Sequence, residues 1–249
     1  MLGCKPANFP IEVNHHLGSG IGDPVDKERY LRLVKRLYLS HTRPDIAYAV
    51  GVVSQFMHDP HDSHLDAVYR ILIYLKSAPD SILFSNHGNL RLEAFTDADW
   101  VGSGDDKRST SGYCTFLGGN LVTWRSKKQT IVARSSAEAE LLLKNLICEL
   151  LWLKLLLKDQ GAIHERSMRL YCDNKAAINI AHNPVQHDKT KHIEIDRHFI
   201  KEKLDQKLIC TPFVSLENQL ADVFTKGLSC KQFNYIVCKL DMRNIYAPT

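Results

Sequence analysis

Cysteine pairs, a targeting segment and long apolar runs are all missing from this sequence. The chain has seven cysteines, an odd number, and no two of them are spaced Cys-x-x-Cys. A disulfide framework or a zinc site is therefore not expected, and free thiols in a reducing compartment fit better. The chain does not open on a charged and then apolar signal pattern, and Lys154 interrupts its longest apolar stretch. We expect a protein that is intracellular and cytoplasmic, neither secreted nor membrane-bound.

A strong excess of one charge is missing too. The formal net charge is only +4, which permits contact with nucleic acid but does not argue for it. Apolar residues make up 44% of the 249 residues, which is enough to bury a core. This length suits one domain with an appendage, or two small domains.

The first third of the chain predicts a small helical unit. Residues 1–23 are rich in proline and glycine and indicate an extended arm. Apolar residues then recur at helical spacing in three stretches, the last of which ends at Pro79. The predicted helices cover residues 24–39, 44–57 and 63–76.

The remainder, from about 90 to 245, predicts an α/β domain. Alternating apolar residues indicate three strands and then a long helix, after which strands and helices alternate. Gly118 and Gly119 lie between two of the strands and are typical of a hairpin turn. This order predicts a mixed five-stranded sheet with flanking helices. The predicted strands are 90–97, 112–117, 121–125, 168–172 and 208–214. The predicted helices are 136–159, 175–182 and 193–204, and residues 218–226 are predicted to start a final helix.

Four acidic residues lie where such a fold gathers its active-site groups, at strand ends and helix starts. Asp97 and Asp173 each end a predicted strand, whereas Glu140 and Asp222 lie in the first turns of predicted helices. Four carboxylates in one pocket would repel one another, so they need cations. Oxygen ligands without nearby thiolates or imidazoles suit Mg²⁺ or Mn²⁺. Two such ions about 4 Å apart would support phosphodiester hydrolysis.

Each of these residues has an ordinary structural alternative when it is taken alone. Asp173 could cap a helix, and Asp222 could complement a helix dipole. Asp99 competes with Asp97, because it lies on the same face if the strand continues. Glu138 competes with Glu140, although Glu138 fits a capping box with Ser135.

Several motifs follow one another in an order that resembles one protein family, the Pol polyproteins of copia-type retrotransposons. Their order and number make the resemblance specific, and it extends over almost the whole chain. The motifs are Phe95-Thr-Asp-Ala-Asp-Trp100, Lys107-Arg-Ser-Thr-Ser-Gly-Tyr113, Trp124-Arg-Ser-Lys-Lys-Gln129, Ser135-Ser-Ala-Glu-Ala-Glu140, Tyr171-Cys-Asp-Asn174, Lys191-His-Ile-Glu-Ile-Asp-Arg-His198 and Gln219-Leu-Ala-Asp-Val-Phe-Thr-Lys226.

The resemblance implies a ribonuclease H-like domain at residues 90–245. Such a domain cleaves the RNA strand of an RNA–DNA hybrid with two Mg²⁺ ions, and Asp97, Glu140, Asp173 and Asp222 would be its catalytic metal ligands. Residues 1–85 resemble the C-terminal end of a reverse transcriptase, a thumb-like or connection-like remnant. The polymerase signature Tyr-x-Asp-Asp is missing, so polymerase activity is not expected. The remainder of a Pol polyprotein would be a partner, in the cytoplasm or in virus-like particles.

A hybrid duplex is recognised through its phosphates and its shape, which requires basic and hydrogen-bonding side chains. Two segments supply them, one around the predicted hairpin and one rich in histidine. A solvated hairpin edge is an equally good interpretation of the first segment. The second segment lacks the ligand set of a zinc site. The candidates are Lys107, Arg108, Ser109, Thr110, Arg125, Lys127, Lys128, Asn174, Lys191, His192 and His198.

Two stretches are one residue shorter than in similar sequences, one near Lys35 and one between Glu140 and Ile147. A deletion inside a helix turns every later residue by about 100° around its axis. The alternative hypothesis is therefore a decayed remnant that folds, and binds nucleic acid, without cutting it. An integrase or transposase shares the fold, but its glutamate comes last in an Asp-Asp-Glu order, whereas here it comes second.

Overall fold

The computed structural model describes ten stretches of the chain. No helix within them has the length and apolar character that crossing a membrane requires. The described residues are 4–15, 17–20, 22–37, 42–76, 81–99, 107–130, 132, 143–162, 166–182 and 191–243.

The three helices expected in the first part of the chain are confirmed. The first begins after Asp26, whose carboxylate accepts a hydrogen bond from the backbone N–H of Glu28 at 2.9 Å. The second starts as a 3₁₀ turn with Pro44 at its first position, where a missing N–H costs nothing. These elements are α1 (Lys27–Arg36), η2 (Pro44–Ile46), α2 (Ala47–Ser54) and α3 (Asp62–Leu75).

The expected mixed sheet of five strands is confirmed as well. Its order is β4-β3-β2-β5-β6, with β2 antiparallel to β3 and parallel to β5. Gly118 and Gly119 make the predicted hairpin turn, with φ angles of 59° and 90° that favour glycine. The strands are β2 (Leu92–Asp99), β3 (Thr110–Leu117), β4 (Asn120–Lys128), β5 (Met168–Tyr171) and β6 (Ile209–Cys210).

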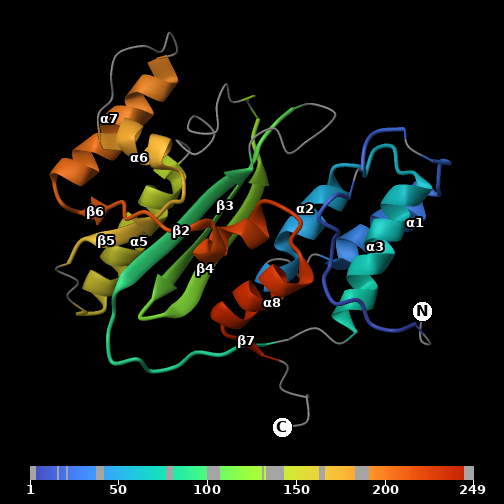
Figure 1. Ribbon diagram of the computed structural model, residues 1–249, viewed down its shortest axis with the longest axis horizontal. Coiled ribbons are helices and arrows are strands. Elements are labelled where there is room, and N and C mark those ends of the chain that lie inside the picture. Colours follow the sequence, from blue (N-terminus) through green and yellow to red (C-terminus); the bar gives the residue numbers. More distant parts are fainter. Residues whose placement is uncertain are drawn as a thin grey trace.

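Helices cover both faces of this sheet (Figure 1). On one face, α5 (Leu143–Asp159) packs on β2 and α7 (Lys191–Asp205) packs on α5. Buried apolar side chains of the sheet, such as Leu92 and Leu170, meet Leu150 of α5 and Ile200 of α7 there. The helix α6 (Lys175–His182) packs against α7 beside them.

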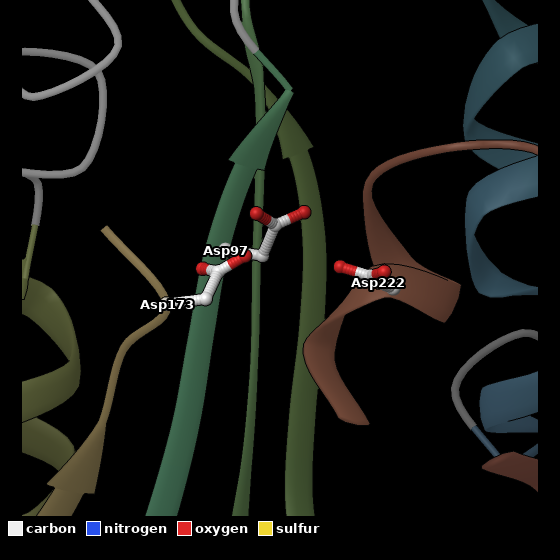
Figure 2. Close-up of side chains that lie close together, drawn as sticks. All are labelled: Asp97, Asp173 and Asp222. Atoms are coloured by element: carbon white, nitrogen blue, oxygen red, sulfur yellow. The ribbon is translucent and has the colours of Figure 1, made fainter. Parts of the chain in front are cut away.

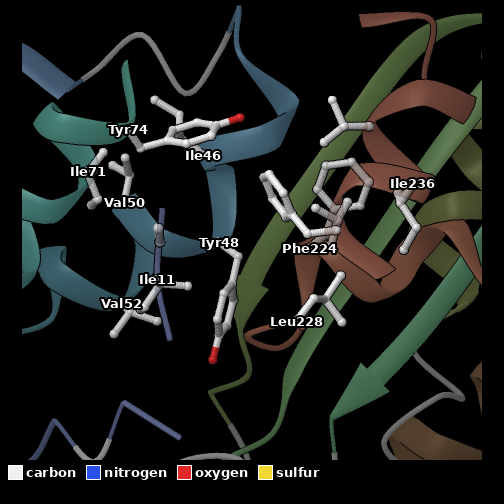
Figure 3. Packing of buried hydrophobic residues seen from close by; sticks show 14 of the residues in the cluster. Ile11, Ile46, Tyr48, Val50, Val52, Ile71, Tyr74, Phe224, Leu228 and Ile236 are labelled. Atoms are coloured by element: carbon white, nitrogen blue, oxygen red, sulfur yellow. The ribbon is translucent and has the colours of Figure 1, made fainter. Parts of the chain in front are cut away.

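The other face of the sheet is covered by the N-terminal helices together with the end of the chain. A continuous core joins Ile46 and Val50 of the helical unit to Phe224 and Ile236 near the end of the chain (Figure 3). Val53 of α2 and Phe116 of β3 belong to the same core. A short ladder between β1 (Ser81–Ile82) and β7 (Met242–Arg243) ties the two regions at their ends. The division at residues 85–90 stays a prediction, and the hydrophobic core runs across it.

The predicted final helix at 218–226 is wrong. Two short 3₁₀ helices, η3 (Leu216–Asn218) and η4 (Leu220–Phe224), occupy that stretch, and a separate helix α8 (Cys230–Lys239) follows. Gln219 separates the 3₁₀ helices because its backbone is extended, with ψ of 100°, and its side chain caps η4 by accepting from the N–H of Ala221. The strand predicted at 208–214 is shortened to β6, because Pro212 has no N–H for the ladder, and a single parallel bridge between Cys172 and Phe213 follows.

Candidate metal centre

Three carboxylates from distant parts of the chain meet at one end of the sheet. Asp97 lies on β2, Asp173 follows β5, and Asp222 lies on η4 (Figure 2). Each offers an oxygen atom, and these oxygens all lie within 4.8 Å of one another. Asp97 and Asp222 are buried and Asp173 is half-buried. Asp97 therefore belongs to the cluster, and its competitor Asp99 does not.

The approach of η4 to the sheet depends on a glycine. Gly112 of β3 is the direct partner of Asp97 in the ladder. A Cβ atom at Gly112 would lie 2.5 Å from Cβ of Phe224 and 2.8 Å from Cγ2 of Thr225, closer than such atoms come. The missing side chain lets η4 pack directly on the strand, which brings Asp222 to Asp97.

Asp173 is held by an amide rather than by a charge. Nε2 of Gln219 donates to Oδ1 of Asp173 at 3.0 Å and to the carbonyl oxygen of Thr96 at 2.9 Å. Gln219 is completely buried, so its side chain links the residue before Asp97 to Asp173 across the sheet. This amide fixes the spacing between the two strand ends that carry the carboxylates.

Asp97 has two partners from the segment that follows η4. The hydroxyl of Thr225 donates a hydrogen bond to its Oδ2. Nζ of Lys226 lies 3.3 Å from the same oxygen and 2.9 Å from Oδ1 of Asp222. One ammonium group therefore bridges the two most buried carboxylates.

Burial dominates the electrostatics of the cluster. It raises the pKa of Asp222 to about 7, with Asp97 adding to the rise and Lys226 opposing it. Burial also raises the pKa of Asp173, and Asp97 contributes again. The pKa of Lys226 would fall through burial, but the two neighbouring carboxylates raise it above its ordinary value. Asp173 and Asp222 are thus poorly stabilised as anions and would gain from a further cation.

The residues present fit divalent metal ions. All three converging groups are hard oxygen donors, and the ammonium of Lys226 already lies among them as a cation bound by two of the carboxylates. Glu140, the fourth predicted ligand, lies outside the described residues, and so does its competitor Glu138. The described part of the site therefore offers a carboxylate triad.

Basic residues of the hairpin line a cleft next to the triad. The cleft holds about 160 Å³ and is bordered by Asp97, by Arg125, Lys127 and Gln129 of the hairpin, and by Asn145 of α5. Arg125 and Lys127 are exposed on β4 and lie two residues apart, so they share one face of the strand.

The other predicted nucleic-acid contacts are more scattered. Lys107 and Arg108 are exposed just before β3, and Thr110 is half-buried at its start, whereas Ser109 is completely buried and does not reach the surface. Nζ of Lys128 donates to Oε1 of Gln55 at 2.7 Å.

Asn174 has the structural role of a helix cap. Its Oδ1 accepts hydrogen bonds from the backbone N–H groups of Ala176 at 3.0 Å and Ala177 at 3.1 Å, at the start of α6. His198 is exposed on α7. The side chains of Lys191 and His192, on the same helix, lie outside the described part.

Sequence reasoning missed four residues that assemble the site: Gly112, Gln219, Thr225 and Lys226. The last three surround Asp222 at positions −3, +3 and +4, as polar residues within an otherwise apolar stretch. That spacing was a usable signal, because residues three and four apart lie on one side of a helical turn.

Comparison with known proteins places the chain among mobile-element proteins. It is 40% identical over 252 residues to the retrovirus-related Pol polyprotein from transposon RE1 of Arabidopsis thaliana, covering 98% of this chain and 17% of that protein. It is 42% identical over 236 residues to the corresponding polyprotein from transposon RE2 of the same plant, covering 92% of this chain and 16% of that one. The chain thus spans about one sixth of these relatives. No family model matches it.

Among solved structures, the fold is similar to that of LC11-RNase H1 in complex with an RNA/DNA hybrid. The sequence identity is 12% and the TM-score is 0.39, over 54% of this chain and 94% of that chain.

Replacing Gly112 by alanine tests how the triad is assembled. The added methyl group must push η4 away from β3, so we expect Gly112→Ala to lower the free energy of unfolding by about 1–3 kcal/mol, as overpacking does. Gly51→Ala is the matched control, because its Cβ would meet nothing closer than 3.9 Å on an α-helix. We expect that control to be neutral or stabilising by up to about 1 kcal/mol. Equal effects of the two changes in urea unfolding would contradict the packing argument.

The raised pKa of Asp222 predicts a pH-dependent stability in the presence of a chelator. A folded-state pKa of about 7 lies above the unfolded value, so the folded protein binds the proton of Asp222 more tightly than the unfolded chain does. The contribution of this carboxyl group to the free energy of unfolding is therefore fully present below about pH 4 and is lost as the pH rises through 7. We expect wild type to lose a few kcal/mol relative to Asp222→Asn between pH 4 and pH 8. Urea unfolding of both proteins at several pH values measures this difference, and parallel pH profiles would show that Asp222 titrates normally.

Proposed function

Because the chain belongs to the Pol polyproteins of copia-type retrotransposons, we propose that its sheet domain hydrolyses the RNA strand of RNA–DNA hybrids. The convergence of Asp97, Asp173 and Asp222 within 4.8 Å is the observation that carries this proposal. A buried cluster of carboxylates is costly for folding unless it binds cations. Together with the remainder of a Pol polyprotein, the domain would remove the RNA template during reverse transcription.

The residues of the cluster have separate tasks in this proposal. Asp97 and Asp222 would share one divalent ion, while Asp173, with Glu140, would hold a second one. Mg²⁺ or Mn²⁺ ions bound there would supply the activated water and would stabilise the leaving oxygen. Thr225 fixes the carboxylate of Asp97 through its hydroxyl, and Gln219 fixes that of Asp173 through its amide.

The cleft beside Asp97 is the proposed entry for the scissile strand. Arg125 and Lys127 face it and would bind phosphates on either side of the bond that is cut. Asn145 is exposed on the same cleft and would offer its amide group to the sugar hydroxyls that distinguish RNA from DNA. Lys107 and Arg108 would extend the basic surface along the duplex.

Hydrolysis of a labelled RNA–DNA hybrid with Mg²⁺ tests the proposal. We expect wild type to cleave the RNA strand and Asp97→Asn to lose more than about 100-fold in rate, since even the outer partners of metal ligands contribute 10- to 100-fold. Asp99→Asn is the matched control, because Asp99 lies two residues away on the same strand but outside the triad. It should keep most of the activity.

Two outcomes would contradict the proposal. Cleavage by Asp97→Asn at the wild-type rate would remove the triad from the mechanism. A folded wild-type protein that binds the hybrid without cutting it would favour the alternative of a decayed remnant.

Removing the two basic side chains of the cleft tests the substrate contact separately. We expect Arg125→Ala with Lys127→Ala to weaken binding of the hybrid and to reduce the slope of log K against log salt by roughly 0.9 for each lost phosphate contact. Lys231→Ala, an exposed lysine on α8, is the control and should change neither quantity. An unchanged salt slope in the double variant, measured by fluorescence anisotropy, would show that the hybrid binds elsewhere.

A further inference from the structure

The ammonium group of Lys226 is built into the carboxylate cluster. Its Nζ lies 2.9 Å from Oδ1 of Asp222 and 3.3 Å from Oδ2 of Asp97. The side chains of these aspartates are only 8% and 5% exposed, while that of Lys226 is 32% exposed. The lysine side chain is thus more exposed to solvent than either of the carboxylates that it contacts.

Local contacts hold the lysine at this place. Its backbone N–H donates to the carbonyl oxygen of Asp222 at 3.2 Å, which holds the residue close to the end of η4. Lys226 also lines a small cleft with Ile11 of the N-terminal arm, Tyr48 of α2 and Phe233 of α8. The lysine therefore lies where the N-terminal region meets the end of the chain.

A divalent ion shared by Asp97 and Asp222 would need the same oxygens. Mg²⁺ binds carboxylate oxygens at about 2.1 Å and requires nearly octahedral geometry. An ammonium group within 3.3 Å of both carboxylates would lie in or against that coordination shell. Two cations at this separation repel each other strongly, and the low dielectric of a buried site increases the repulsion.

We propose that Lys226 is a resident counter-cation of the cluster, which holds Asp97 and Asp222 together in the absence of divalent ions and is displaced when they bind. The lysine would then set the concentration of Mg²⁺ at which the site fills. It acts as a positioning residue, and the inference rests on the proposed role of the two aspartates as metal ligands.

Metal binding and melting in Lys226→Met test the competition, because methionine keeps the apolar stem and removes the charge. We expect the variant to bind Mg²⁺ roughly tenfold more tightly in calorimetric titration, the size of effect that outer-shell groups have on metal affinity. In a chelator its melting temperature should fall by about 2–4 °C, and saturating Mg²⁺ should remove that deficit. Lys231→Met is the control and should match wild type in both measurements.

Labelling of lysines with an amine-reactive reagent, followed by mass spectrometry, tests the displacement itself. We expect Mg²⁺ to increase the labelling rate of Lys226 several-fold and to leave that of Lys231 unchanged. An unchanged or slower rate for Lys226 would overturn the proposal, as would equal or weaker Mg²⁺ binding by Lys226→Met. If neither wild type nor Lys226→Met binds Mg²⁺ in the titration, the proposal is overturned too. Hydrolysis of the hybrid by wild type is measured in parallel. If wild type cleaves the hybrid while Lys226 shows none of the expected effects, the role of Lys226 is wrong and the proposed function stands.

Discussion

Repulsion among buried carboxylates is the constraint around which this end of the protein is organised. Asp97, Asp173 and Asp222 lie within 4.8 Å of one another, where burial makes each negative charge expensive. The surrounding residues offset that cost in different ways: Thr225 and Gln219 donate hydrogen bonds, and Lys226 supplies a positive charge. Such a cluster lowers the free energy of unfolding. Titratable groups in such unfavourable surroundings are typical of functional sites, including those that bind metal ions.

The helical unit at the N-terminus is part of the same arrangement. Ile46 and Val53 belong to the core that supports Phe224, and Phe224 packs over Gly112 beside Asp97. Tyr48 and Ile11 line a small cleft together with Lys226. The N-terminal helical unit thus contributes to the geometry of the candidate metal centre through packing.

The sequence predicted those features that depend on local pattern. Alternation of apolar residues located the strands, the Gly118-Gly119 pair located the hairpin, and Asp97 and Asp173 were singled out because each ends a predicted strand, although β2 itself runs on to Asp99. Features that depend on contacts between distant segments were not predictable in this way. Nothing near Gly112 in the chain shows that Phe224 packs against it, and no local pattern pairs Gln219 with Asp173. The extended backbone of Gln219 also breaks what reads as one helix into 3₁₀ turns, because tertiary hydrogen bonds outweigh helical propensity there.

Binding of divalent ions by the triad is tested most directly by diffraction. Crystals grown with Mn²⁺ should give two anomalous difference peaks about 4 Å apart, one shared by Asp97 and Asp222 and one next to Asp173. The first peak should be accompanied by a changed position of Lys226. Mn²⁺ peaks confined to other acidic surfaces, with none within bonding distance of the three aspartates, would contradict the account.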